Sequence, residues 1–211
     1  MRSWIYLLFL LIAGLAAVVP SFGDEPPFRP LFDGKTFNGW EGNLKVFRIE
    51  DGAIVGGNLK KGLPENEFLC TTKEYPNFEL TMQFKILGKG ANAGVQIRTK
   101  RVPNSTEVIG YQADLAEGLW GCLWEEGGRY WLAGPKKSEI GKPVKRQDWN
   151  DYRIRCQGNH VEIWINNVKT TDYYEKSDKA LSTGVIGLQI HSGPPSEAWY
   201  RNVMIKELPE S

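Results

Sequence analysis

Cysteine and histidine are scarce in this sequence, and that scarcity limits the chemistry it can carry. Only three cysteines and two histidines occur among 211 residues. Cys70, Cys122 and Cys156 are too far apart for a zinc knuckle. Three thiols exclude a disulfide framework, although two of them could pair in an oxidising compartment. The alternating apolar residues around Cys156 favour a buried, structural thiol at that position.

An excess of charge is also missing. The chain has 26 Lys and Arg against 25 Asp and Glu, which argues against a general nucleic-acid binder. The HExxH, G-x-S-x-G and Walker motifs do not occur, and no G-x-G-x-x-G follows a strand. With so few candidate ligands we predict no catalytic zinc and no organic cofactor. The sequence leaves undecided whether loop oxygens bind a calcium ion, because such ligands have no distinctive sequence pattern.

The one long apolar run lies at the N-terminus. Arg2 precedes an apolar stretch over residues 4–19, and Ser21 and Gly23 supply small residues before Asp24. This pattern is typical of a secretory signal peptide over residues 1–23, and an uncleaved anchor is the alternative. No cysteine follows the run, so we expect no lipid attachment. The sequence therefore predicts a secreted or periplasmic protein with no membrane span after cleavage.

Glycine, proline and aromatic residues are plentiful. The chain contains 23 Gly, 12 Pro, 8 Trp, 8 Tyr and 9 Phe, and no segment keeps a helical period. Short alternating runs recur between turn signals, as in residues 78–86, 94–98, 110–115 and 185–191. Asp51-Gly52 and Asn166-Asn167 are typical of tight hairpin turns. We therefore predict an all-β sandwich of two antiparallel sheets.

We expect one domain over residues 31–208, after a Pro-rich lead-in at 24–30. The stretches 60–67 and 135–148 are expected to be loops. Alternation assigns one side of each run to the core. That side consists of Leu80, Met82, Phe84, Val95, Ile97, Ile163, Ile165, Leu188, Ile190, Val203 and Ile205.

Polar side chains share the opposite side of two strands. Residues two apart on a strand share a face, so Gln112 goes with Asp114 and Gln189 with His191. Arg98 ends another strand and could converge with them. The alternatives are an ordinary solvated sheet surface, or an ion pair of Arg98 with Asp114. The other histidine, His160, begins a hairpin strand and is expected to have a surface role.

An aromatic cluster lies in the Gly-rich stretch 118–128. Trp120 and Trp124 could stack on sugar rings, and Glu126 could accept hydroxyl hydrogen bonds. The alternative is that these tryptophans cap the core. Glu125 and Glu126 are strand neighbours that point to opposite faces, so only one of them can reach a given sugar.

Several motifs together resemble one family. They are LFDGKTFNGW at 31–40, NAGVQIR at 92–98, GYQAD at 110–114, WNDY at 149–152, GNHVEIWINNV at 158–168, IGLQIH at 186–191 and YRNVMIKEL at 200–208. In order and spacing they are similar to the 3-keto-disaccharide hydrolase domain family. The resemblance covers residues 30–208. It implies a concanavalin A-like jelly roll with a sugar site on its concave sheet, in a bacterial secreted or periplasmic protein.

The resemblance implies hydrolysis of 3-keto-glycosides or 3-keto-disaccharides, through elimination and then hydration. His191 or Asp114 would be the base, Arg98 would stabilise the enolate, and Gln112 and Gln189 would hold hydroxyl groups. The sequence departs from the family pattern at two positions, with Asp114 replacing an amide and Gln112 replacing a Glu. A sugar-binding module without catalysis, or an envelope interaction domain, remains the competing hypothesis.

Overall fold

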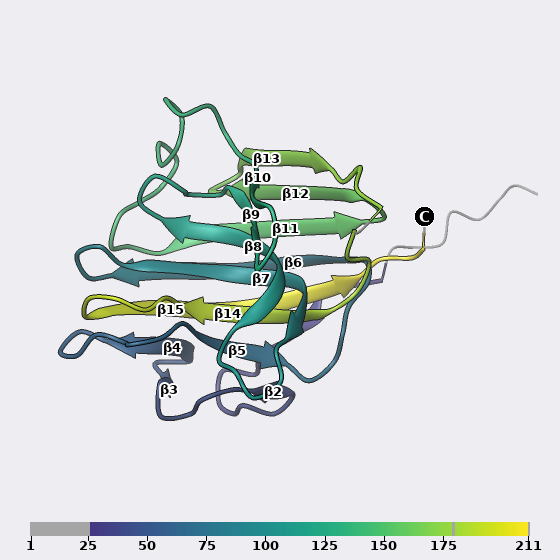
Figure 1. Cartoon of the computed structure of the whole chain (residues 1–211). Helices are drawn as coiled ribbons and strands as arrows, with labels where there is room; N and C mark the ends of the chain where they lie inside the picture. The colour runs from purple at the N-terminus through teal and green to yellow at the C-terminus, as the bar shows by residue number, and fades with distance from the viewer. Residues whose placement is uncertain (1–25, 179, 211) are drawn as a thin grey trace, which may run out of the picture.

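A computed structural model describes residues 26–178 and 180–210, and these form two antiparallel sheets packed face to face (Figure 1). The eight-stranded sheet contains β1 (Arg29–Pro30), β3 (Phe47–Glu50), β4 (Ala53–Asn58), β6 (Phe78–Leu87), β11 (Asn150–Gln157), β12 (His160–Ile165), β13 (Val168–Tyr174) and β15 (Ser196–Glu207). The seven-stranded sheet contains β2 (Trp40–Glu41), β5 (Glu67–Thr71), β7 (Asn92–Arg101), β8 (Val108–Ala116), β9 (Leu123–Glu126), β10 (Tyr130–Ala133) and β14 (Val185–Ile190). No helix occurs in these ranges, so the predicted all-β sandwich is confirmed.

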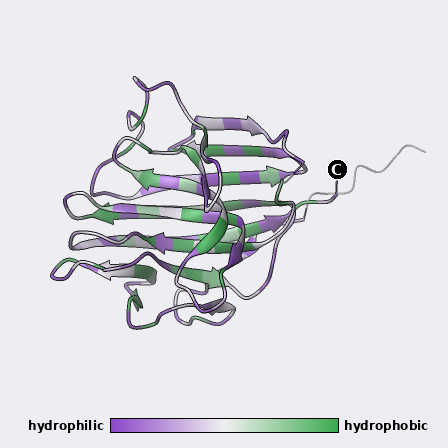
Figure 2. Cartoon of the chain, in the orientation of Figure 1, coloured by the Kyte–Doolittle hydropathy of each residue, from purple (hydrophilic) through white to green (hydrophobic). Residues whose placement is uncertain are grey.

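The core lies between the two sheets. In β6 buried and partly exposed residues alternate, and Figure 2 shows the matching alternation of green and purple along the strands. All eleven side chains assigned to the core from the sequence are buried. The two-residue alternation of apolar and polar side chains therefore explains both layers, because each strand turns its apolar side to the other sheet.

The two predicted hairpin turns are present. Asp51 and Gly52 join β3 to β4 with φ of 50° and 71°, and Asn166 and Asn167 join β12 to β13 with φ of 48° and 64°. Asn, Asp and Gly tolerate this left-handed region better than other residues, and two such residues in a row give the twist of a tight hairpin.

The N-terminal boundary differs from the expectation. Arg29 and Pro30, predicted to be part of the lead-in, pair with Ile205 and Met204 of β15. The predicted signal peptide lies outside the described residues. Within the described ranges, no helix has the length and apolarity that a membrane crossing requires.

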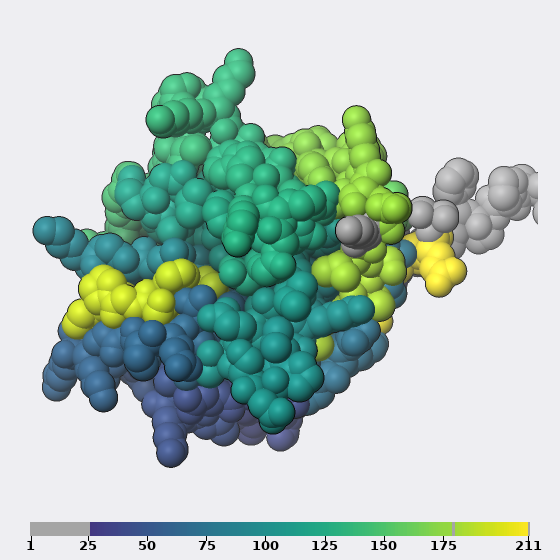
Figure 3. Space-filling view, viewed as in Figure 1, coloured from purple at the N-terminus to yellow at the C-terminus, as the bar shows by residue number. Residues whose placement is uncertain are grey.

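The hairpin of β7 and β8 bends over the outer face of its own sheet, the face turned away from the core. The register shifts between Ile97 and Lys100, and Arg98 has a φ of 49°. Gly110 has a φ of 153°, and a Cβ there would lie 2.5 Å from the Thr99 Oγ1, so the bend requires glycine. Beyond the bend, Val108 packs on outward-facing residues of β5 and β14, namely Phe68, Cys70 and Val185. Figure 1 shows this teal ribbon crossing in front of β14 and β5, and Figure 3 shows the same residues bulging over that face.

Candidate functional site

Polar side chains line the outer face of the seven-stranded sheet beneath the bent hairpin. Gln112 and Asp114 come from β8, Gln96 from β7 and Gln189 from β14, and each is at most 3% exposed. Gly94 of β7 pairs with Asp114 on one side and with Gln189 on the other. The strand alternation predicted from the sequence therefore brings Gln112, Asp114 and Gln189 to one face.

A buried chain of hydrogen bonds ends at Asp114. The Thr99 hydroxyl donates to Gln96 Oε1 (2.8 Å), and Gln96 Nε2 donates to Gln112 Oε1 (2.5 Å). Gln112 Nε2 then donates to Asp114 Oδ1 (2.7 Å). The chain crosses over Gly94, where a Cβ would lie 2.6 Å from the Gln112 Cδ. Only glycine at this position leaves room for the Gln112 side chain. The hydrogen bonds fix the orientation of the Gln96 and Gln112 amides.

Asp114 has the properties of a proton carrier near neutrality. Burial raises the pKa of its carboxyl to about 7, with a smaller increase from the nearby charge of Glu126, while the Gln112 hydrogen bond lowers it. Its Oδ2 is buried and has no hydrogen-bond partner. One oxygen of the carboxyl is therefore held in place, while the other has no partner among the described residues.

Glu126 lies near this carboxyl, and Glu107 and His191 lie near Glu126 in turn. Burial and the charge of Glu107 raise the pKa of Glu126, and the charge of His191 lowers it, so the three side chains share one electrostatic environment. Asn66 donates to both carboxylate oxygens of Glu107 (3.3 and 3.4 Å) and accepts from the Ser192 amide (3.0 Å). The loop before β5, the tip of the hairpin and the end of β14 thus meet here.

The tautomer of His191 follows from its contact. Its Nδ1 lies 2.8 Å from the Ser192 carbonyl oxygen, which can only accept, so Nδ1 carries a proton. Nε2 is then the nitrogen that can take or give a proton.

Several buried polar atoms at this face lack a partner. They include both side-chain polar atoms of Gln189, Oδ1 of Asn92 and Oδ2 of Asp114. Asn92 and Gln189 lie on the neighbouring strands β7 and β14, and the His191 amide donates to the Asn92 carbonyl oxygen (3.0 Å). Buried polar groups in native proteins are almost always satisfied, so ordered water or a polar ligand is expected to contact this set.

Arg98 lies away from this group, and its predicted convergence with Asp114 and His191 is wrong. The positive φ at Arg98 turns its side chain toward the other sheet. The guanidinium donates to Pro76 O (2.7 Å), Gly158 O (2.7 Å) and Asn77 Oδ1 (3.0 Å). Arg98 is 3% exposed, so its donors are used in tying the two sheets together.

Of the predicted aromatic residues, only Trp124 borders the site. Trp120 is 7% exposed and stacks on Phe84 with ring centroids 6.1 Å apart, so it caps the core and its predicted sugar contact is wrong. Trp124 pairs with Gln112 across β8 and β9, and it is half-buried against Tyr130. Glu125 binds Arg129 (2.6 Å) on the other face, so Glu126 is the carboxylate on the site's side.

Four residues of the site were missed in the sequence. Gln96 and Asn92 share the face of Gln112, and the alternation of 92–98 could have identified both. Glu107 and Asn66 come from loops, where no period assigns a face. Glu107 meets Asn66 only because the hairpin bends, which local sequence patterns do not specify.

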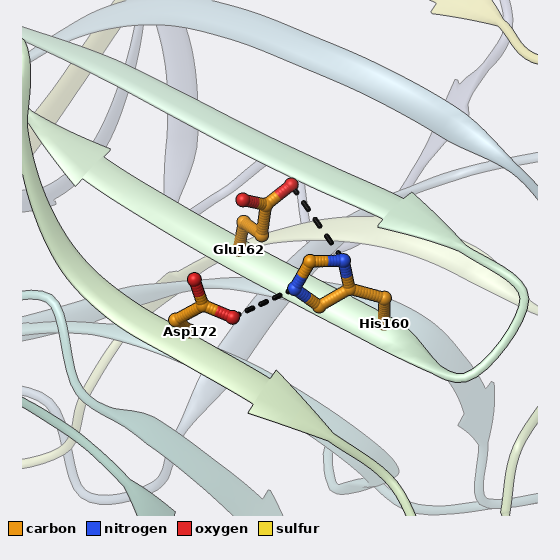
Figure 4. A group of neighbouring side chains, drawn as sticks. All are labelled: His160, Glu162 and Asp172. Atoms are coloured by element: carbon orange, nitrogen blue, oxygen red, sulfur yellow. Dashed lines mark hydrogen bonds and ion pairs between the residues drawn. The ribbon is translucent and has the colours of Figure 1, made fainter.

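A second group of potential ligand atoms lies on the eight-stranded sheet. His160, Glu162 and Asp172 place theirs within 4.8 Å of one another (Figure 4). The Lys169 ammonium already contacts Glu162 (2.6 Å) and Asp172 (2.8 Å), and His160 contacts Asp172 (2.7 Å) and stacks on Tyr174. A metal ion would have to displace this cation, so the arrangement is a surface ion-pair network.

All three cysteines are buried and unpaired. Burial raises the pKa of Cys70 to about 11 and the pKa values of Cys122 and Cys156 to about 12. The expected structural role of Cys156 is therefore confirmed, and none of the thiols is a nucleophile near neutral pH.

Comparison with known proteins gives one family and a set of related folds. The sequence profile of the 3-keto-alpha-glucoside-1,2-lyase-like domain matches residues 27–206. A Bacteroides thetaiotaomicron protein named 3-keto-disaccharide hydrolase is 38% identical over 82 residues, which are 34% of this chain and 27% of that protein. The match thus spans about a quarter of that relative.

Solved structures share the fold at low identity. A candidate glycosyl hydrolase from Parabacteroides distasonis is 24% identical with a TM-score of 0.65, and the match covers 86% of this chain and 94% of that one. The carbohydrate binding module CBM66 from Bacillus subtilis is 14% identical with a TM-score of 0.63, covering 80% and 96%. A Bacillus subtilis protein with a galectin-like fold is 12% identical with a TM-score of 0.66, covering 88% and 96%. These likenesses establish a lectin-like jelly roll.

Proposed function

This chain belongs to the family of 3-keto-alpha-glucoside-1,2-lyase-like domains, and from that premise we propose that it cleaves the glycosidic bond of 3-keto-glycosides, including 3-keto-disaccharides. The observation that carries the proposal is Asp114. Its carboxyl is buried, has a pKa of about 7, and leaves one oxygen unpartnered on the same sheet face as the equally unpartnered amide of Gln189. A ketone substrate needs such a base, because the ketone at C3 acidifies the hydrogen on C2.

The first half of the reaction is an elimination. The Asp114 carboxylate takes the proton from C2, and the electron pair of that C–H bond forms the double bond between C1 and C2. The bond from C1 to the glycosidic oxygen breaks, and its pair leaves with the oxygen. Glu126 and His191 lie close enough to influence each other's charge, and together they supply the proton that the leaving oxygen takes.

The second half is a hydration. Water adds its hydroxyl to C1, and its proton restores the acid formed by Glu126 and His191. Asp114, after exchanging its proton with solvent, protonates C2, so that one water is consumed overall. Charge develops on the C3 oxygen in both halves. The Gln189 Nε2 donor stabilises that charge, in the role first expected of Arg98. Gln112 holds Asp114, and Trp124 borders the sugar on the β9 side.

The test is turnover of 3-keto-trehalose or a 3-keto-glucoside, followed by the release of free sugar. Asp114→Asn keeps the Gln112 contact but removes the base, so kcat should fall roughly 10²- to 10⁴-fold. His191→Ala should also lower kcat, whereas His160→Ala, the matched control on the other sheet, should not. For wild type, kcat should rise as the pH increases through about 7, because Asp114 must lose its proton to act as a base.

Two outcomes would contradict the proposal. Full turnover by both Asp114→Asn and His191→Ala would show that the reaction occurs elsewhere. Binding of the sugar by wild type without turnover would favour a sugar-binding module. The elimination route has its own test in D₂O, where the proton returned to C2 comes from solvent. A product without deuterium at C2 would exclude elimination while leaving direct hydrolysis possible.

We also propose that the protein is exported and acts as a secreted or periplasmic enzyme. The support is Arg2, the apolar stretch 4–19 and the small residues before Asp24. N-terminal sequencing of protein recovered from the producing cells should give Asp24 as the first residue. A chain that still begins at Met1 would contradict cleavage.

A further inference from the structure

A hollow of about 580 Å³ lies on the outer face of the eight-stranded sheet, on the opposite side of the sandwich from Asp114. Its lining residues on this face are Thr81, Gln83, Asp151, Arg153, Trp164, Asn167, Asn202 and Met204. The register aligns Trp164, Arg153, Thr81 and Met204 in one row across four strands. Its volume is within the range of about 300–1,000 Å³ that ligand pockets occupy.

Two local backbone features shape this hollow. In β15 the register shifts between Arg201 and Met204, and Asn202 at the bulge has a φ of 53°. At the other end, Asn167 has a φ of 64° in the turn between β12 and β13. Both asparagines are exposed, so each backbone irregularity presents a side-chain amide at the rim.

The lining offers donors and acceptors that no other described residue uses. Arg153 binds Glu79 through Nε (2.6 Å), which leaves its Nη groups free, and it stacks on Trp164 at 4.4 Å from the ring centroid. Asp151 accepts from Gln83 through Oδ1 (2.9 Å), which leaves Oδ2. Asn202 donates to Gln83 (3.2 Å), which leaves its oxygen. The indole N–H of Trp164 and the amide of Asn167 have no partner within the described ranges.

The chemistry of this lining selects the class of ligand. The two charged groups of the lining, Arg153 and Asp151, have opposite signs, so the lining has no cluster of one sign that would select a strongly charged ligand. Alternating donors and acceptors suit hydroxyl groups, which both donate and accept. Met204 and the edge of Trp164 add apolar contact of the kind that sugar C–H groups make. We propose that this hollow is a second carbohydrate site, which binds a neutral oligosaccharide and takes no part in catalysis.

Isothermal titration of the chain with cellotetraose, xylotetraose, maltotetraose and mannotetraose tests the proposal. At least one should bind wild type. The double variant Asn167→Gly/Asn202→Gly removes both rim amides but keeps the two turns, because glycine tolerates positive φ. It should weaken binding about tenfold or more, the worth of one to two lost hydrogen bonds. Asn104→Gly, at an exposed asparagine with a φ of 57° in the turn between β7 and β8, is the matched control and should bind like wild type.

Two further variants separate the two faces. Trp164→Ala should lower affinity, and Tyr174→Ala, an exposed aromatic residue of the same sheet outside the hollow, should not. Asp114→Asn should leave affinity for these neutral sugars unchanged. The proposal is overturned if none of the four sugars binds at millimolar concentration. It is also overturned if Asp114→Asn weakens binding while the double glycine variant does not, or if tetragalacturonate binds better than every neutral sugar.

Discussion

Asp114 is the residue whose environment differs most from that of a surface carboxyl. It is 2% exposed and faces one donor, the Gln112 amide, while its second oxygen has none. Ionising a buried carboxyl costs free energy, because the low-dielectric surroundings replace the hydration of the charge only in part. The same burial that raises the pKa of Asp114 therefore destabilises the folded chain when Asp114 is charged.

That cost predicts an unusual dependence of stability on pH. The pKa of Asp114 is about 7 in the folded chain against an ordinary value of 3.8, so the folded state binds the proton more tightly than the unfolded state. The contribution of Asp114 to the free energy of unfolding is fully present below about pH 4 and is lost as the pH rises to about 7. The loss is at most about 4 kcal/mol. Asp114→Asn should lack this loss. Urea unfolding at pH 4 and pH 8 measures it.

The variant should be more stable than wild type at pH 8 and nearly equal to it at pH 4. Parallel stability curves for the two proteins would show that Asp114 is not buried as described.

At the scale of the strands, alternation explains most of the site and the bulge explains its largest error. The period of two in β8 and β14 correctly assigns Gln112, Asp114 and Gln189 to one face. The same alternation, continued from Gln96, places Arg98 on that face too. One extra residue in a strand, however, moves every later side chain to the opposite face. The bulge depends on tertiary contacts of Arg98 with Asn77 and Gly158, which are distant in sequence.

Arg98 is therefore expected to stabilise the fold and to have no part in the reaction. Arg98→Met removes three hydrogen bonds from a buried guanidinium, so the free energy of unfolding should fall by about 3 kcal/mol or more. In the folded fraction, kcat on a 3-keto-glycoside should stay within about tenfold of wild type, below the usual worth of a catalytic group. Urea unfolding and steady-state kinetics on one preparation measure both quantities.

Arg101→Met is the matched control, since this arginine of the same hairpin is exposed and should change neither quantity. A loss of kcat of a thousandfold in Arg98→Met with normal stability would restore the catalytic role.

At the scale of the whole molecule, the two sheets meet through apolar side chains that the sequence identified correctly. Their burial follows from strand period alone, whereas the loops that cover the outer faces had no comparable signal. Ile163 of β12 is fully buried, so Ile163→Ala should lower the free energy of unfolding by about 2–5 kcal/mol. Val168→Ala, at a residue that is 51% exposed, should change it by less than about 0.5 kcal/mol. Equal effects of the two substitutions would mean that the register of β12 is wrong.

The burial of the three thiols also determines how the folded chain responds to reducing and oxidising conditions. Cys70, Cys122 and Cys156 are unpaired and shielded from solvent. The folded protein therefore has no disulfide that glutathione could reduce and no exposed thiol that an oxidant could pair. Their raised pKa values keep thiolate, the form that exchanges with disulfides, rare at physiological pH. The described fold therefore contains no bond that the redox potential of the buffer could make or break, so its stability should be the same with and without a thiol reductant.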